Sequence, residues 1–535
     1  MAQSARDPLF YACLTIANQD AAFAGDICLR CHTPGGWLSG RSTPTDGSSL
    51  SSLDLDGVSC SVCHRMVDPV FKPGVSPPRD EAIIAAINPP PLVPGSGNFV
   101  MDPVDVRRGP YADLQGVNPG HLWSPSPFHR SPELCGTCHD VSNPLYERQP
   151  DDTYVLGPLN QAHNPEQNQY RMFPLERTYS EWLHSDFAKR GVDMGARYGA
   201  QQVVSTCQDC HMPVASGKGC SFGVSRDDLR GHDFAGGNAW VQDMILNLYP
   251  DSGLNTEYLH EGKERAVSML RRACSLELSQ EGNQVNVRVV NETGHKLPTG
   301  YPEGRRMWIN VQVLDEELDV IREYGHYDGA TADLAVYDTK VYEIKLGLDA
   351  AVAALVNLPV GESFHFALNN VVVKDNRIPP RGFTNAAYRN VQAMPVAERY
   401  DDGQYWDDSR FRLPLGAHSI RVSVHYQTAS KEYVTFLRDE NRTNDDGQVL
   451  YDQWELTEKS PPVEMSDATI AIMPFAGGDA DGDGRIDGAD YGGFATCMTP
   501  PMAGSIDLDC VEFDFDADGD VDLYDFGQLQ QAFSD

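Results

Sequence analysis

The sequence has no long hydrophobic run and few basic residues. No stretch of about 18 apolar residues occurs in its 535 residues, so we expect no membrane span. Residues 1–8 also lack the apolar core of a signal peptide. Lys and Arg number 42 against 77 Asp and Glu, a formal net charge of −35. This charge repels nucleic acid phosphates and anionic lipids, so we expect no nucleic acid partner; cationic partners, metal ions or solubility alone would account for it.

Four pentapeptides, at residues 28–32, 60–64, 135–139 and 207–211, share the pattern Cys-x-x-Cys-His. In c-type haem attachment, the two thiols bind the porphyrin and the adjacent histidine takes the proximal iron position. Four Cys-x-x-Cys pairs could instead build two zinc sites, but zinc gives no reason for a histidine after every second cysteine. The sequence therefore predicts four covalently bound haem c groups. Their predicted residues are Cys28, Cys31, His32, Cys60, Cys63, His64, Cys135, Cys138, His139, Cys207, Cys210 and His211.

Haem c is attached outside the cytoplasm, which conflicts with the missing signal peptide. We therefore expect an exported protein whose signal has been removed, extracellular or at the cell surface and otherwise periplasmic. Such a compartment permits disulfides. Of the five cysteines outside the haem motifs, Cys497 and Cys510 are expected to pair, while the pairing of Cys13, Cys220 and Cys274 stays open.

Each haem iron also needs a group in its second axial position. His295 is the sharpest candidate, because the glycines around it and Pro298 favour a loop that can approach a flat ligand closely. The other candidates are His232, His129 and His121, with His184 and His260 as rivals. If two histidines hold every iron, the haems only pass electrons; an open iron could act on a small nitrogen or sulfur compound. Spare histidines exceed the need, which favours electron transfer over catalysis.

The chain divides into three predicted domains. Residues 1–262 are expected to form a haem-dense, mostly irregular and helical domain, because thirteen prolines lie between residues 69 and 127. Residues 263–472 begin with a helix and continue with alternating apolar residues, which predicts an antiparallel β-sandwich. Its expected strands include 285–290, 309–313, 364–368 and 433–436.

Residues 473–535 form the third domain, a small helical module with two acidic loops. Residues 479–490 place aspartates at positions 1, 3, 5, 9 and 12 with a glycine at position 6, and residues 514–525 repeat the pattern. Oxygen ligands at this spacing are what calcium needs, so two Ca²⁺ ions are predicted. The predicted metal residues are Asp479, Asp481, Asp483, Arg485, Asp490, Asp514, Asp516, Asp518, Asp520 and Asp525.

The four pentapeptides, with Glu181-Trp182 before the fourth, resemble the multihaem cytochrome c superfamily that includes cytochrome c554-like proteins. The stretch 294–300, Gly-His-Lys-Leu-Pro-Thr-Gly, resembles a motif of its extracellular members, in which a β-domain supports the haems. The resemblance implies stacked haem pairs, two histidines on each iron and electron transfer outside the cytoplasm. Some tetrahaem relatives form filaments in which the next subunit supplies a distal histidine.

The tail resembles a dockerin type I module, except that Gly488-Ala489 and Leu523-Tyr524 replace the Ser/Thr pairs of cellulosomal dockerins. The resemblance implies calcium-dependent folding and attachment to a surface partner or to another copy. We therefore expect an extracytoplasmic tetrahaem electron carrier rather than an enzyme, whose partners are redox proteins or copies of itself in a filament. A multihaem oxidoreductase and a calcium-dependent surface assembly protein are the alternatives.

Overall fold

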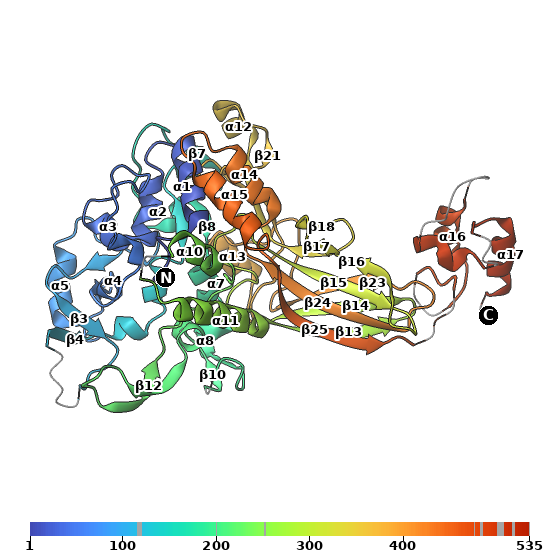
Figure 1. Cartoon of the computed structure of the whole chain (residues 1–535), viewed down its shortest axis with the longest axis horizontal. Coiled ribbons are helices and arrows are strands. Elements are labelled where there is room, and N and C mark those ends of the chain that lie inside the picture. Colours follow the sequence, from blue (N-terminus) through green and yellow to red (C-terminus); the bar gives the residue numbers. More distant parts are fainter. Residues whose placement is uncertain are drawn as a thin grey trace.

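The computed structural model describes residues 1–114, 120–199, 201–250, 253–473, 475, 477–481, 485–499, 508–515 and 519–533. A broad body lies at one end, a narrower stack of strands projects from it, and a small C-terminal module lies beyond the strands (Figure 1). Three predicted calcium residues, Asp483, Asp516 and Asp518, lie outside the described residues. None of the helices in the described ranges has the length and apolar character needed to cross a bilayer.

The body consists of short elements joined by long connections. Its longest N-terminal helix, α1, begins at Pro8 and is capped by the Asp7 carboxylate, which accepts from the Leu9 and Phe10 N–H groups. The elements of the body are α1 (Pro8–Asp20), α2 (Gly25–His32), α3 (Pro34–Leu38), η1 (Asp54–Asp56), α4 (Cys60–Cys63), β1 (Met66–Val67), α5 (Pro78–Ala85), β2 (Val100–Met101), β3 (Val106–Gly109), β4 (Leu122–Pro125), η2 (Pro127–Arg130), α6 (Glu133–Gly136), β5 (Val141–Asn143), β6 (Tyr146–Arg148), β7 (Tyr154–Leu156), η3 (Gln169–Arg171), β8 (Phe173–Glu176), α7 (Thr178–Leu183), α8 (Asp186–Arg190), β9 (Val192–Asp193), β10 (Val203–Val204), α9 (Cys207–His211), β11 (Val214–Lys218), β12 (Ser225–Arg230), α10 (Val241–Leu248) and α11 (Thr256–Ala273).

Two antiparallel sheets follow the body and enclose one apolar core. The first has the order β13-β14-β23 and the second the order β16-β15-β24-β25, with β19 also paired to β15. Alternate side chains of both sheets, among them Val287, Val311 and Val422, are fully buried in the same cluster. The elements of this part are β13 (Cys274–Glu281), β14 (Gln284–Asn291), β15 (Arg306–Leu314), β16 (Val320–Tyr324), β17 (Tyr327–Asp328), β18 (Asp333–Leu334), β19 (Val341–Tyr342), β20 (Ile344–Leu348), α12 (Ala350–Val356), β21 (Gly361–Glu362), β22 (Val371–Asp375), α13 (Asn385–Asn390), β23 (Trp406–Arg412), β24 (Ser419–Gln427), α14 (Lys431–Asp439), α15 (Asp446–Leu456) and β25 (Val463–Ala471).

Two of the expected strands are wrong. Residues 433–436 belong to helix α14, which Ser430 caps by accepting the Tyr433 N–H and which buries Tyr433, Val434 and Leu437. That burial follows the period of a helix, and the capping serine stabilises its first turn. Residues 364–368 lie in a turn region between β21 and β22 rather than in a strand.

The body and the sheets share a second core. Helices α14 and α15 pack with α1 and α10, and residues from all four helices form one buried cluster that includes Ile16, Met244, Val434 and Trp454. The expected helix from residue 263 begins at Thr256, so the predicted domain boundary at 262/263 falls inside α11. The residues after 263 therefore help to build the wall of the body.

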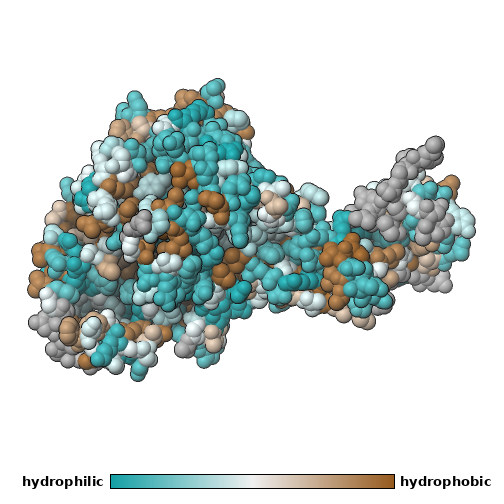
Figure 2. All heavy atoms as spheres, in the orientation of Figure 1, coloured by the Kyte–Doolittle hydropathy of each residue, from teal (hydrophilic) through white to brown (hydrophobic). Residues whose placement is uncertain are grey.

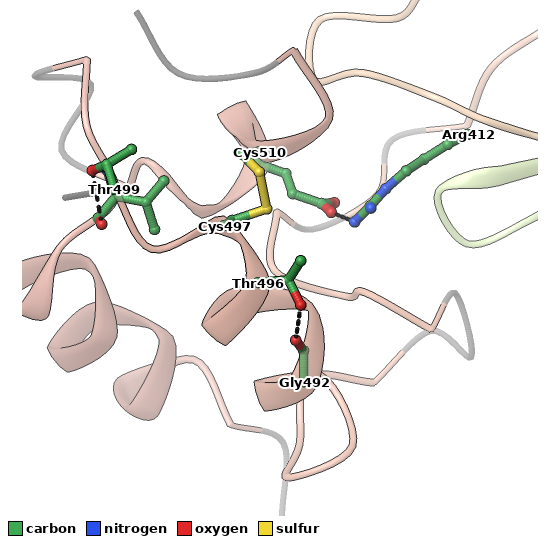
Figure 3. The surroundings of a disulfide bond; sticks show 8 residues. Arg412, Gly492, Thr496, Cys497, Thr499 and Cys510 are labelled. Atoms are coloured by element: carbon green, nitrogen blue, oxygen red, sulfur yellow. Dashed lines mark hydrogen bonds and ion pairs between the residues drawn. A yellow bond between two sulfur atoms is a disulfide. The ribbon is translucent and has the colours of Figure 1, made fainter. Parts of the chain in front are cut away.

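The C-terminal module contains α16 (Tyr491–Cys497), η4 (Leu508–Phe513) and α17 (Leu523–Gln531) around a small apolar cluster. The predicted Cys497–Cys510 disulfide is confirmed and joins α16 to η4 (Figure 3). The module meets the end of the sheets through Asn283, whose Nδ2 donates to the Asp479 carbonyl at 2.6 Å and to a Glu512 carboxylate oxygen at 3.0 Å. An Arg412–Glu512 ion pair adds to this contact.

Candidate haem and calcium sites

The eight motif cysteines lie in pairs on or beside four short helices of the body. All eight are free thiols. The Cys31 thiol contacts the Cys138 thiol, and the Cys135 thiol contacts the Cys207 thiol. These buried contacts bring the first, third and fourth motifs together. Within the described ranges, no three histidine or cysteine side chains converge as zinc ligands would. The thiols therefore fit covalent attachment to a large group better than a zinc site.

Each motif histidine is held through its Nδ1 atom. His32 contacts the Ser4 carbonyl at 3.3 Å, His64 the Arg108 carbonyl at 2.6 Å and His211 the Ala235 carbonyl at 2.7 Å. The fourth, His139, contacts the Glu176 carboxylate at 3.2 Å. A metal-binding histidine typically donates its second ring N–H to such an acceptor, which fixes the ring and leaves Nε2 for the metal. In the described part of the chain, none of these four Nε2 atoms has a hydrogen-bond partner.

The surroundings also set the charge of these rings. Burial lowers the pKa of His32 and of His211 to about 4, so both imidazoles are neutral at pH 7, as metal binding requires. Burial would lower the pKa of His139 too, but the Glu176 carboxylate outweighs it and raises the pKa to about 9. In turn, the hydrogen bond from His139 outweighs the burial of Glu176 and holds the pKa of this carboxyl below its usual value.

Two motif histidines face a second histidine at the separation of axial ligands. Nitrogen ligands lie about 2.0 Å from a metal, which puts two imidazole centres on opposite sides of one iron about 6 Å apart. The ring centres of His211 and His295 are 6.5 Å apart with planes at 19°, and those of His64 and His232 are 6.2 Å apart with planes at 40°. The His295 Nδ1 atom contacts the Lys296 carbonyl at 2.9 Å, so its Nε2 also remains for a metal.

His129 and His121 lie differently. The His129 ring is 5.7 Å from His64, but its Nε2 atom contacts the Cys63 carbonyl at 2.9 Å and its buried Nδ1 has no partner among the described residues. His121, just before β4, is exposed and contacts the Leu122 carbonyl. No histidine ring of the described ranges lies at an axial separation from His32 or His139, and His32 instead stacks on Phe10 at 4.0 Å. The ligand assignments of His121 and His129 stay predictions.

The donor atoms of the four motifs match those that haem c attachment uses. The His139 side chain is 52% exposed, whereas the Glu176 side chain beside it is 16% exposed. Each motif offers two free thiols and an imidazole whose Nε2 atom has no hydrogen-bond partner among the described residues, so the residues present fit haem c.

The loop that carries His295 is fixed by buried charges. The Glu181 carboxylate of α7 accepts the Lys296 N–H at 3.1 Å and the Thr299 hydroxyl at 2.8 Å. The Lys296 ammonium donates to Asp375 at 2.7 Å, and Arg377 lies against both acids. In the sequence, Glu181 stood out only as the neighbour of Trp182, and no pattern pointed to Glu176. Neither residue belongs to an attachment motif.

The tail brings together acidic residues from each predicted calcium loop. Carboxylate oxygens of Asp479, Asp481 and Asp490 lie within 4.8 Å of one another, and so do those of Asp520, Asp522 and Asp525. Asp490 accepts the Ala480 and Asp481 N–H groups, which closes its loop. Asp514 accepts the Gly519 N–H at 3.0 Å. Converging carboxylates of this kind fit Ca²⁺. The other predicted ligands Asp483, Asp516 and Asp518 lie outside the described residues.

The comparisons with known proteins add one structural likeness. No family model and no curated protein matches the sequence. Among solved structures, the chain is similar to a penta-heme cytochrome c552 from Thermochromatium tepidum, with 16% identity, a TM-score of 0.44 and 83% of each chain covered. Since likeness at this level carries no argument, the function is inferred from the residues of this chain alone.

Proposed function

We propose that this protein is an exported multihaem c-type cytochrome that passes electrons along four covalently bound haems. The observation that supports this proposal best is the placing of two histidine pairs. His211 faces His295, and His64 faces His232, at the separation of two axial ligands, and paired free thiols lie beside them. When bound, haem supplies reversible one-electron chemistry. Irons with two histidines have no position for a substrate, so such centres transfer electrons and do no further chemistry.

The residues of the chain have separate tasks in this function. Paired cysteines attach the haems, and contact between the first, third and fourth motifs keeps neighbouring haems close. Backbone carbonyls fix the proximal imidazoles, and the Glu181 network fixes the His295 loop. The acidic surface favours cationic redox partners, and the calcium tail provides a site of attachment to a surface partner or another copy.

The test is a ligand substitution read by spectroscopy. Protein matured with haem c should contain four covalent haems by mass, and its reduced spectrum should show low-spin iron. His295→Ala and His232→Ala should each convert one haem to a high-spin form. His260→Ala, on the exposed face of α11, should change nothing. Absence of covalent haem, or unchanged low-spin spectra in both ligand variants, would contradict the proposal.

A second candidate function rests on the two motifs without a facing histidine. No histidine ring of the described residues lies at axial separation from His32 or His139, so an open iron at either motif is the alternative to a distal ligand from elsewhere in the chain or from another copy. An open iron would make the protein a multihaem oxidoreductase for a small nitrogen or sulfur compound. Cyanide or nitrite that shifts the spectrum of purified monomer would favour the oxidoreductase. Filaments in electron micrographs, with four low-spin haems, would favour assembly by ligand exchange.

A further inference from the structure

One of the four motif histidines has a carboxylate where the others have a carbonyl. His32, His64 and His211 each direct Nδ1 at a backbone oxygen. His139 directs Nδ1 at Glu176 Oε1, 3.2 Å away. A carbonyl oxygen carries a partial charge, whereas the Glu176 carboxylate carries a full one. The proximal ligands of the four haems are therefore not electronically equivalent.

The fold holds this carboxylate firmly in place. Glu176 ends strand β8, which pairs with β5 so that Glu176 lies opposite Val141, two residues after His139. The Tyr179 N–H then donates to the His139 carbonyl at 2.9 Å, so the chain after β8 wraps around the histidine. The Thr178 hydroxyl donates to the same Glu176 oxygen at 3.1 Å. Glu176 is 16% exposed, so solvent screens its charge weakly.

The chemical effect of this contact on a bound iron has a definite direction. A carboxylate that accepts the Nδ1–H of a ligating histidine makes the imidazole more basic and a stronger donor to the metal. Stronger donation, together with a buried negative charge nearby, stabilises the oxidised iron, which carries one more positive charge than the reduced iron. Both effects lower the reduction potential. Among the four motif histidines, only His139 has the carboxylate hydrogen bond, because the other three direct Nδ1 at backbone carbonyls. The charge of Glu176 also acts on His32 and His295, but through space and without a hydrogen bond to either ring.

We propose that Glu176 is a tuning residue that makes the haem held by His139 the lowest-potential haem of the four. This inference rests on the proposed function, because it requires haem c at the motifs. The third motif contacts the first through Cys138 and the fourth through Cys135. A haem held by His139 would therefore neighbour those of the first and fourth motifs, and would form an uphill step for an electron that passes between them.

The test is a redox titration of the full haem-loaded chain. Glu176→Gln keeps the shape of the side chain and removes its charge. The lowest of the four reduction steps should move furthest toward a more positive potential, and the low-spin electron paramagnetic resonance signal of one haem should shift. Glu133→Gln removes a charge beside the same motif without touching His139, and should move no step comparably.

Each other outcome counts against the inference. Four unmoved steps in Glu176→Gln, a negative shift, or an equal shift in Glu133→Gln would overturn it. If Glu176→Gln does not fold, Glu176→Asp retracts the charge by one methylene and should still give a smaller positive shift; no shift in that variant overturns the proposal. Mass spectrometry separates this from the proposed function, since a protein without covalent haem contradicts the function, whereas four haems with unmoved potentials contradict only the role of Glu176.

Discussion

At the scale of single residues, Glu303 is a buried acid outside both predicted metal sites. Its side chain is 3% exposed, and within the described ranges its one polar partner is Asn369, which donates at 3.3 Å. Burial raises the pKa of Glu303 to about 8. The nearby Cys13, Tyr301 and Tyr433 stay neutral, because burial raises the pKa of the thiol to about 12 and those of both phenols well above their usual value.

The raised pKa of Glu303 predicts that the free energy of unfolding falls as the pH rises. The folded state binds the proton up to about pH 8, whereas the unfolded state releases it above its ordinary pKa of 4.5. The stabilising effect of the bound proton is therefore complete below pH 4.5 and lost between pH 4.5 and 8, on the order of 5 kcal/mol. Glu303→Gln should remove this slope and raise the free energy of unfolding above pH 8, measured by urea titration at several pH values. A variant with the same pH slope as the parent would contradict the assignment.

The attachment residues could be predicted from sequence because they are local, whereas the residues around them could not. The thiols and histidine of a motif share one helical turn, so their spacing is visible in the chain. The partners of His64 and His211 come from distant segments and meet them only through packing. The turn glycines around His295 gave a signal for its loop; Glu176 gave none, because its role depends on the pairing of β5 with β8.

At the scale of elements, a cluster of four buried charges joins the body to the sheets. Glu181 comes from α7, Lys296 from the loop after β14, and Asp375 and Arg377 from the end of β22 and just beyond. Lys296 and Glu181 are fully buried. Burial lowers the pKa of Lys296, while Arg377 and Lys296 outweigh the burial of Asp375 and hold its pKa below the usual value. Both acids and both bases are needed, since each neutralises a neighbour that no water reaches.

Asp375→Asn should therefore destabilise the junction strongly. It leaves the Lys296 and Arg377 cations with one acid between them, and breaking a buried ion pair costs about 3–5 kcal/mol. Asp408→Asn is the matched control, because the Arg288–Asp408 pair is exposed on β23 and β14 and should contribute about 1 kcal/mol or less. Urea titration of both variants measures the difference. An equal loss of unfolding free energy in the two variants would contradict a larger contribution from the buried cluster.

The spacing of apolar residues in the sequence did not by itself predict every element of the sheets correctly. Strand β14 buries every second residue over most of its length, and this alternation is visible in the sequence, whereas the first six residues of β15 are all buried. At residues 433–436, a short apolar stretch fits either period, and the capping Ser430 with the packing of α14 on α1 decides for the helix. Short stretches of this kind are decided by tertiary contacts that the sequence does not display.

At the scale of the molecule, the body with the four Cys-x-x-Cys-His motifs and the C-terminal module with the acidic loops occupy opposite ends (Figure 1). Hydrophilic residues cover much of the visible face, and hydrophobic residues gather in patches on the body and at the end of the sheets beside the tail (Figure 2). The tail meets the sheets there through Asn283 and the Arg412–Glu512 pair. The backbone carbonyl of Asp479 accepts from Asn283 while its carboxylate joins the first acidic group, so this residue links the first acidic loop to the sheets.

Removal of calcium should loosen the tail and leave the haems unchanged. Without an ion, the carboxylates of Asp479, Asp481 and Asp490 repel one another, so the loop opens and its contact with Asn283 weakens. We expect chelation, or Asp490→Ala, to expose residues 473–535 to limited proteolysis at a rate at least ~10-fold higher, since loss of one charged contact of ~1.5 kcal/mol shifts an opening equilibrium by about that factor. The haem spectrum should stay the same, because the motifs lie in the body. Asp467→Ala, an exposed acid on β25, is the control and should leave the cleavage rate unchanged. Cleavage of the tail at equal rates with and without calcium would contradict a calcium-dependent fold.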